Sequence, residues 1–249
     1  MKIYINVPQE TKMWFFNMYN LIFNSLKDLG HQLTDIQNSE IIIAIQHFPD
    51  YIKKEIGKKY ILLQVEQRSN PNIDVTCYYK FADKIWGFDI DNKKEEYLVL
   101  GYHPCLENNE QVQKNINVSF FGCYTPRRQV FFSRVVNKPV LTSTWDYRVK
   151  LINIKKSKIN LNYHSYAAST YTEWDRICLI LSNKSFLLSE NFYCPLKINQ
   201  FSNTKEYDDV VRYFFSHEKE REEIANKLYI EYKTKYDMRR ILEEKLKCL

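Results

Sequence analysis

Two carboxylates frame a short segment that runs from Glu173 to Asn191. Glu173 opens a helical pattern, and Glu190 follows the apolar run at 186–188, which is typical of a buried strand. A carboxylate can accept hydrogen bonds from two vicinal hydroxyls, as on a ribose. Glu173 also has capping-box spacing from Thr170, so a helix cap is an equally good interpretation. An exposed acidic loop residue is the corresponding alternative for Glu190.

Several cations could neutralise a phosphate beside these carboxylates. Gly122 ends a predicted strand and leads into a helix that carries Arg127 and Arg128. Free N–H groups at a helix start, the positive end of its dipole and an arginine together suit a diphosphate. A surface ion pair is the alternative for these two arginines. Arg176 and Lys158 are the other cations available.

Open parallel sheets bind ligands beyond the carboxyl ends of their strands, so residues that directly follow predicted strands are candidates. This rule selects the segments 66–70, 101–104, 122–128, 162–176 and 189–191. His103 and His164 lie in two of them. A lone histidine is more often structural, so each of these is either a ligand contact or a packed side chain.

Apolar runs alternate with helical patterns along the first half of the chain. Strands are predicted at 2–7, 40–46, 60–66, the end of 80–89 and 95–104, and a helix at 10–30 that ends at Gly30. This alternation predicts a parallel sheet with helices on its faces.

A polar segment at 106–117 breaks the rhythm and is predicted to link two lobes. The second half then repeats the alternation. Its predicted strands lie at 117–122, 138–143, 158–164 and 186–188, and its predicted helices at 126–136, 147–157, 173–181 and in the charged tail 203–249. The sequence therefore predicts a compact α/β chain of two Rossmann-like lobes facing a cleft. The boundaries are 1–112 and 113–249, with the C-terminal helices closing the second lobe.

Composition narrows the functional class. The 249 residues carry a net charge of +6, which looks diluted along the chain and suits a small anionic ligand better than a nucleic acid. The six cysteines have no zinc-site spacing and are interpreted as free thiols of a reducing cytosol. No signal peptide or membrane-spanning run is evident, so we expect a cytoplasmic protein without a transmembrane segment.

Four motifs, in order, resemble GT-B-type glycosyltransferases of the spore-maturation (CgeB-like) and capsule or viral kind. They are "VEQRSN" with "IWGFDIDN" and "VLGYHP" (65–104), "VSFFGCYTPRRQVFFSRV" (118–135), "SKINLNYH" (157–164), and "EWDRICLILSNKSFLLSE" (173–190). Together with the tail, the likeness covers roughly residues 60–249.

The resemblance implies a donor lobe at the C-terminal end, an acceptor lobe at the N-terminal end and no essential metal or other cofactor. The donor would be a nucleotide sugar, UDP- or GDP-linked, and the acceptor a glycan or other hydroxyl compound. The implied donor-binding residues are Gly122, Arg127, Arg128, Lys158, Asn162, His164, Glu173, Arg176 and Glu190. Glu66 and His103 are the candidates for orienting or deprotonating the acceptor.

Two other hypotheses stay open at this point. The first is a catalytically silent nucleotide-sugar-binding or scaffold protein on the same fold. The second is a nucleic-acid-associated protein, which the dilution of the charge disfavours. The sequence does not indicate the sugar, the stereochemistry of transfer or the oligomeric state.

Overall fold

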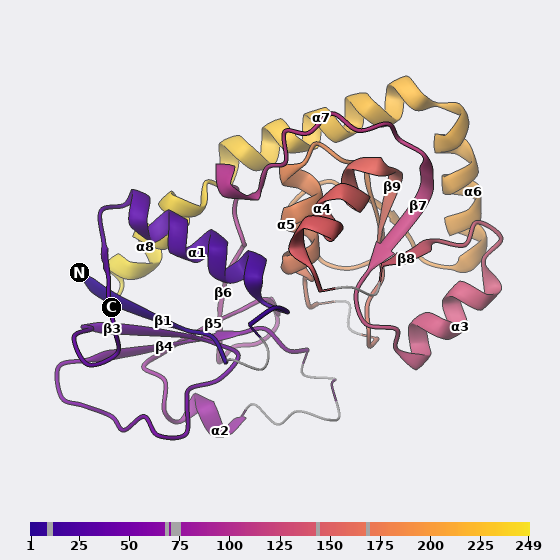
Figure 1. Cartoon of the computed structure of the whole chain (residues 1–249). Helices are drawn as coiled ribbons and strands as arrows, with labels where there is room; N and C mark the ends of the chain where they lie inside the picture. The colour runs from indigo at the N-terminus through magenta and orange to yellow at the C-terminus, as the bar shows by residue number, and fades with distance from the viewer. Residues whose placement is uncertain (9–11, 68–69, 71–75, 143–144, 168–169) are drawn as a thin grey trace. The chain divides into compact units, whose positions relative to one another are not determined.

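The computed structural model describes residues 1–8, 12–67, 70, 76–142, 145–167 and 170–249 (Figure 1). The chain forms two compact units. Unit 1 comprises Met1–Cys105 together with Tyr236–Leu249, and unit 2 comprises Leu106–Lys235.

Unit 1 is built on a parallel sheet with the strand order β2-β1-β3-β4-β5-β6. The strands are β1 (Lys2–Asn6), β2 (Gln32–Leu33), β3 (Ile41–Ile45), β4 (Lys59–Gln64), β5 (Lys84–Gly87) and β6 (Glu96–Tyr97). The β3 sequence IIIAI is buried throughout because helices or loops cover both faces of a parallel sheet. One face packs Ile42, Ala44 and Leu62 against Phe48 and Tyr60.

The helices of unit 1 come from both ends of the chain. They are α1 (Phe16–Asp28), α2 (Thr76–Tyr79), the 3₁₀ turn Pro104–Leu106, which reaches the unit boundary, and α8 (Met238–Lys247). α8 lies beside α1 (Figure 1). The backbone N–H of Tyr102 donates to Tyr236 O at 2.6 Å, and that of Met238 donates to Tyr102 O at 2.9 Å. These bonds attach the last residues of the chain to unit 1.

Unit 2 repeats the same parallel arrangement, with the strand order β8-β7-β9-β10-β11. The strands are β7 (Ile116–Phe121), β8 (Val140–Thr142), β9 (Ser157–Asn162), β10 (Leu187–Glu190) and β11 (Asn199–Phe201). In both units the first strand lies between the second and the third. The chain reverses its direction of winding there, and this switch point is where doubly wound sheets bind ligands.

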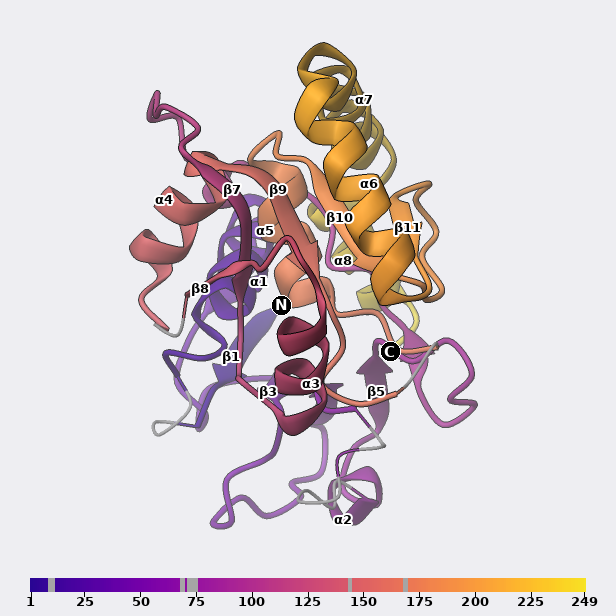
Figure 2. The same cartoon turned by 90° about the vertical axis from the view of Figure 1, so that its right-hand side faces the viewer.

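The helices of unit 2 divide between the two faces of its sheet. They are α3 (Pro126–Arg134), α4 (Tyr147–Lys156), α5 (Trp174–Ser182), α6 (Thr204–Ser216) and α7 (Glu218–Lys235). α3 and α6 lie on one face and α4 and α5 on the other (Figures 1 and 2). The α3–α6 face encloses an aromatic core to which Phe120, Phe131, Tyr163, Phe201 and Tyr207 contribute.

The predicted α/β class with two parallel-sheet units is confirmed, and most strands lie within a residue or two of their predicted positions. The strand predicted at 95–104 is only Glu96–Tyr97, and the short strands β2 and β11 were not predicted. The start of the predicted helix at 10–11 and residue 143 of a predicted strand lie outside the described residues.

The predicted division of the chain differs from the observed one in two respects. The boundary falls at 105/106 instead of 112/113, and residues 236–249 belong to unit 1 instead of the second lobe. The physical reason is α8, which packs on α1, while Lys245 forms an ion pair with Glu96 at 3.2 Å. An amphipathic helix pattern predicts a buried face but does not tell which sheet that face covers.

Candidate functional site

The carboxyl edge of the unit 2 sheet gathers most of the predicted site residues. The loop after β7 begins at Gly122, the loop after β9 begins at Tyr163, and β10 ends at Glu190. α3 starts at this edge, because it follows β7, and brings Arg127 and Arg128 with it. The two arginines bond to backbone oxygens of the β9 loop and so span the β7/β9 switch point.

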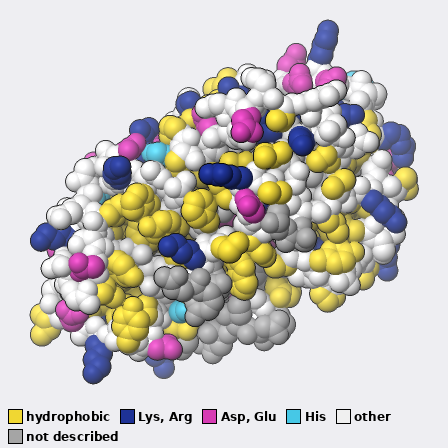
Figure 3. All heavy atoms as spheres, in the orientation of Figure 1, with side chains coloured by type: hydrophobic (Ala, Val, Ile, Leu, Met, Phe, Trp, Pro, Cys, Tyr) yellow, Lys and Arg dark blue, Asp and Glu magenta, His cyan; other side chains and the backbone are white. Residues whose placement is uncertain are grey.

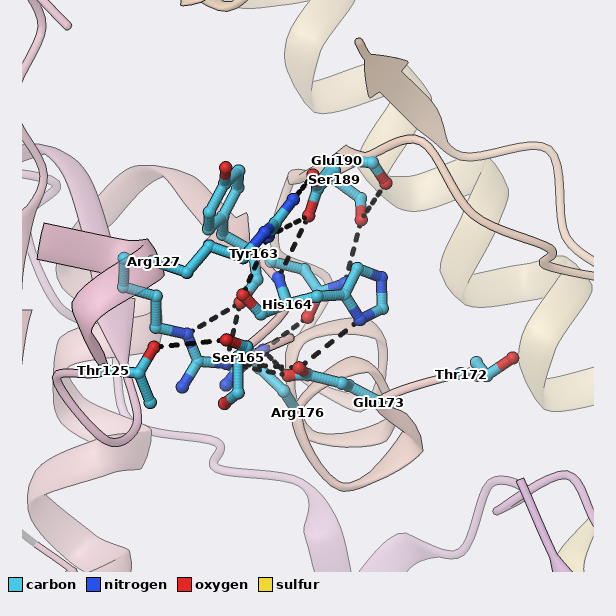
Figure 4. A network of polar contacts seen from close by, with 12 residues as sticks. Thr125, Arg127, Tyr163, His164, Ser165, Thr172, Glu173, Arg176, Ser189 and Glu190 are labelled. Atoms are coloured by element: carbon cyan, nitrogen blue, oxygen red, sulfur yellow. Dashed lines mark hydrogen bonds and ion pairs between the residues drawn. The ribbon is translucent and has the colours of Figure 1, made fainter. Parts of the chain in front are cut away.

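Arg127 and Glu190 form a bidentate ion pair in this loop cluster (Figure 4). Nη1 donates to Glu190 Oε2 at 2.9 Å and to His164 O at 3.0 Å, and Nη2 donates to Glu190 Oε1. The guanidinium group lies 4.4 Å from the centre of the Tyr163 ring. Burial alone would lower the pKa of Arg127, but the Glu190 carboxylate outweighs it and raises the pKa.

This pair lines a cavity of about 420 Å³. Arg134 supplies a second cation, while Phe131, Tyr163 and Phe201 supply an aromatic wall. Phe131 stacks on Tyr163 with ring centres 4.0 Å apart and on Phe201 with ring centres 5.6 Å apart. The cavity therefore combines cations, one carboxylate and flat apolar surface.

The start of α6 forms another part of the cavity wall, through Ser202, Asn203 and Thr204. Asn203 caps the helix by accepting from Glu206 N at 3.0 Å, and Glu206 Oε2 accepts in return from Ser202 N at 2.7 Å. A helix start carries a partial positive charge that favours anions. The cavity can thus hold an anion and an aromatic group together, as in a nucleoside phosphate.

Arg128, Glu173 and Arg176 form a separate ionic network beneath the loops. Their side chains are 2%, 11% and 9% exposed, so they are withdrawn from solvent. Arg128 donates to Glu173 Oε1 at 3.1 Å and to Tyr163 O at 2.7 Å, and Arg176 donates to Glu173 Oε2 and to Phe121 O. The geometry of this network is that of an internal clamp between β7, β9 and α5.

Burial and charge act in opposite directions in this network. Burial lowers the pKa of Arg128 to about 10. Burial by itself would raise the pKa of the Glu173 carboxyl, but Arg176 and Arg128 outweigh it and hold that pKa well below its usual range. His164 Nδ1 lies 3.5 Å from Glu173 Oε1, and its ring points toward the carboxylate (Figure 4).

Gly122 and Asn162 complete the clamp. Gly122 has φ +144°, and a Cβ at this position would lie 2.7 Å from Arg176 Nη2. The residue must therefore be glycine for the arginine to pack beneath the loop. Asn162 Oδ1 accepts from Arg176, and its amide donates to Ser189 Oγ at 2.9 Å.

The structure thus sorts the nine predicted donor residues into three groups. Arg127 and Glu190 reach the cavity. Gly122, Arg128, Asn162, His164, Glu173 and Arg176 lie together in or beside the buried clamp.

Lys158 is not brought to this site. It lies at the amino end of β9, where Nζ donates to Asn117 Oδ1 at 3.0 Å. About five strand residues at ~3.3 Å each separate it from the loop after β9. Glu173 stands at the N-cap position of α5, but its side chain caps no backbone N–H group of the helix. The carboxylate accepts from the two arginines instead, so the capping-box interpretation does not describe its contacts.

Other cavity residues were missed at the level of sequence. Tyr163 lies in the predicted strand 158–164 but directly follows the observed β9, and Phe201 lies in a strand that the sequence did not predict. The start of α6 had a readable signal, since Asn203 and Glu206 have capping-box spacing.

Glu66 occupies the corresponding carboxyl edge of the unit 1 sheet, after β4. Oε1 accepts from Gln46 Nε2 at 3.4 Å, and Oε2 accepts from Asn70 Nδ2 at 3.1 Å. Burial raises the pKa of its carboxyl, partly offset by the Asn70 bond. A half-buried carboxylate with a raised pKa is suited to accept a proton near neutral pH.

His103 does not join Glu66. Its Nε2 lies 3.1 Å from Asp28 Oδ2, and its Nδ1 accepts from Cys105 N at 3.1 Å, so both ring nitrogens have partners. Asp28 ends α1, which runs back along the sheet from the carboxyl end of β1, so this pair lies at the opposite edge. The structure therefore does not bring His103 and Glu66 together, and the acid–base role of His103 stays a prediction.

Three classes of feature are absent from the part of the chain that the structure describes. No three His, Cys, Asp or Glu side chains come together as a metal site. Among the cysteines whose side chains the structure describes, Cys105, Cys123, Cys178, Cys194 and Cys248 form no disulfide. None of the helices in the same ranges has the length and apolar character needed to cross a bilayer.

The strand orders and the two parallel-sheet units define the α/β architecture called GT-B. No family model matches the sequence, and no curated protein matches it significantly. Solved structures do match it in fold. An α-glucosyltransferase bound to UDP and a 13-mer DNA has a TM-score of 0.64 at 10% identity, over 99% of this chain and 98% of that one.

Two further solved structures are similar. The phage T4 enzyme BGT in complex with UDP-glucose gives a TM-score of 0.59 at 14% identity, over 94% of this chain and 96% of that one. An α1,3-fucosyltransferase gives 0.54 at 15% identity, over 92% and 80% respectively. At these identities the likeness establishes the shared fold.

Proposed function

We propose that this chain transfers a glycosyl group from a nucleoside diphosphate sugar to an acceptor hydroxyl. The observation that carries the proposal is the Arg127–Glu190 pair in the wall of the unit 2 cavity. Arg127 and Arg134 supply charge for the diphosphate, Glu190 supplies a carboxylate for ribose hydroxyls, and the stacked rings supply an apolar wall for the base.

The distribution of charge supports an anionic donor in unit 2. Unit 1 contains as many acidic as basic residues, so the whole excess of +6 belongs to unit 2. The charge that looks diluted in the sequence is therefore concentrated on one folded unit. Fold likeness to enzymes solved with UDP or UDP-glucose also supports a nucleotide donor, for which UDP and GDP are the first candidates.

Glu66 is proposed as the general base of the reaction. The acceptor oxygen attacks the anomeric carbon of the donor and forms the new glycosidic bond. The bond from that carbon to the diphosphate breaks, and its electron pair leaves on the phosphate oxygen. The proton of the acceptor hydroxyl passes to the Glu66 carboxylate. Arg127 stabilises the negative charge that develops on the leaving group.

The proposal assigns the neutralisation of the diphosphate to arginine, so we propose a reaction without an essential metal. One solved neighbour, phage T4 BGT, was obtained with UDP and Mn²⁺, and this makes the metal an explicit variable of the test. The likeness of the sequence motifs to spore-maturation and capsule or viral glycosyltransferases supports the same reaction class.

The test is a donor panel of UDP-, GDP- and ADP-sugars, with release of the nucleoside diphosphate as the readout. Each donor is assayed with a mixture of saccharides and hydroxyl-bearing DNA, once with a chelator and once with Mn²⁺. We expect release from one donor class in the presence of chelator. Binding of a donor without release under any condition would favour the silent nucleotide-sugar-binding protein. Failure of every donor to bind at millimolar concentration would contradict the proposal.

A further inference from the structure

The carboxyl edge of the unit 1 sheet gathers amide and carboxylate side chains from neighbouring strands. Gln46 directly follows β3, and Glu66 and Asn70 follow β4, the strand paired with β3. The amide groups of Gln46 and Asn70 each donate to one oxygen of Glu66. These bonds fix the carboxylate from both sides.

Gln46 has an unused hydrogen-bonding atom at this edge. The residue is only 8% exposed, and its Oε1 has no partner among the residues that the structure describes. Its Nε2 is oriented by Glu66, so the orientation of the amide plane is set. A buried oxygen without a partner costs free energy unless a ligand or water donates to it.

A second polar group lies at the end of β5, the strand next to β4. The Glu95 carboxylate packs on Gly87, where a Cβ would lie 1.8 Å from Glu95 Oε2. Tyr79 Oη and Asn92 Nδ2 donate to Glu95 Oε1. The edge thus gathers amide and carboxylate oxygens from successive strands, a set whose chemistry allows it to accept from several hydroxyls.

The charge of unit 1 distinguishes between two classes of acceptor substrate, nucleic acids and neutral hydroxyl compounds. A nucleic acid needs a surface of lysine and arginine to neutralise its phosphates. Unit 1 has no net charge, and its side chains on the face in Figure 3 mix both signs. Glu66 and Glu95 at the edge would repel phosphate. A neutral compound with several hydroxyls meets none of these costs.

We infer that unit 1 binds a neutral saccharide acceptor, whose reacting hydroxyl lies between Gln46 Oε1 and the Glu66 carboxylate. The inference rests on the proposed glycosyl transfer and specifies its acceptor. Gln46 is a specificity residue in this scheme, because it bonds a hydroxyl of the saccharide, while Glu66 receives the proton. DNA, with which the α-glucosyltransferase neighbour was solved, is the competing acceptor.

The test compares a panel of neutral mono- and oligosaccharides with hydroxyl-bearing duplex DNA, using the donor that unit 2 binds. We expect transfer to a saccharide at rates that change little with salt. Gln46→Ala should lower kcat/KM for that saccharide roughly tenfold, the effect of losing one hydrogen bond to substrate. The matched control is Gln37→Ala, an exposed glutamine of the same unit, which should leave kcat/KM unchanged.

Two results would overturn the inference while leaving the proposed function intact. The first is transfer to DNA, with a steep salt dependence, and to no saccharide. The second is an equal kcat/KM for the Gln46→Ala and Gln37→Ala proteins. If Gln46→Ala does not fold, binding of the wild-type protein to an array of neutral glycans and to DNA decides the same question. Donor binding, measured separately, reports on the proposed function alone.

Discussion

Glu173→Gln is predicted to destabilise unit 2 strongly. The substitution removes the only carboxylate that the described contacts assign to Arg128 and Arg176, whose side chains are 2% and 9% exposed. Breaking a buried ion pair by removing one partner costs about 3–5 kcal/mol. For a unit of this size the loss corresponds to a fall in Tm of roughly 10–20 °C. Differential scanning calorimetry measures this shift.

The stabilisation that the Glu173 carboxylate contributes is expected to depend on pH. The folded-state pKa of Glu173 lies below the unfolded one, so its stabilisation is present above about pH 4. It is lost as the pH falls through the folded-state pKa. Glu173→Gln should therefore lose most stability at neutral pH and approach the wild-type protein in acid.

The control for Glu173→Gln is Asp209→Asn in the same unit. Asp209 forms a surface pair with Arg212 at 3.4 Å, with side chains 54% and 73% exposed. An exposed pair contributes little, so this Tm should not change measurably. Equal Tm values for the Glu173→Gln, Asp209→Asn and wild-type proteins would refute the assignment of a structural clamp.

Three further substitutions test other parts of the account. Glu66→Gln should lower kcat roughly 10²- to 10⁴-fold, because it removes the base. Burial raises the pKa of the Glu66 carboxyl, so the neutral glutamine should also raise Tm at neutral pH. In the wild-type protein, kcat/KM should fall as the pH drops below the pKa of Glu66. Lys150→Met should stabilise the protein by about 1 kcal/mol or more. The residue is only 2% exposed, its amine lies near the rings of Trp145 and Phe121, and burial lowers its pKa even though Asp175 partly offsets this effect. A Tm below wild type would count against this prediction. Gly122→Ala should cost about 1–3 kcal/mol by forcing a Cβ against Arg176, and a wild-type Tm would show that the loop is not constrained.

The periodicity of the sequence was sufficient to predict the two α/β units. Runs such as IIIAI at 41–45 are apolar at every position, as expected for a parallel strand covered on both faces. The short strand Asn199–Phe201 has no such run, and its place is set by pairing with β10. The helix Met238–Lys247 has a clear apolar face, but only the folded chain shows that it packs on α1.

The sequence predicted most of the residues that gather at the candidate site, but not which of them line the cavity and which form the buried clamp. Arg127 and Arg128 are adjacent in sequence and point to different surroundings, one to the cavity and the other to the buried clamp. Successive residues on a helix are about 100° apart, so adjacent arginines leave α3 in different directions. Lys158 illustrates the same difficulty along a strand. The motif correctly predicts that this residue lies in a strand, but the residue lies at the amino end of β9, away from the loops that form the site.

The most direct test of the account is a calorimetric titration of the nucleoside diphosphate into three proteins. They are the wild type, Arg127→Ala and Lys158→Ala, two cation deletions at opposite ends of the same sheet. Loss of a charge-assisted contact to phosphate should raise Kd roughly 10- to 150-fold for Arg127→Ala, with Lys158→Ala matching the wild type. Equal affinity of the Arg127→Ala and wild-type proteins, or a loss seen only with Lys158→Ala, would contradict the donor site at the unit 2 cavity.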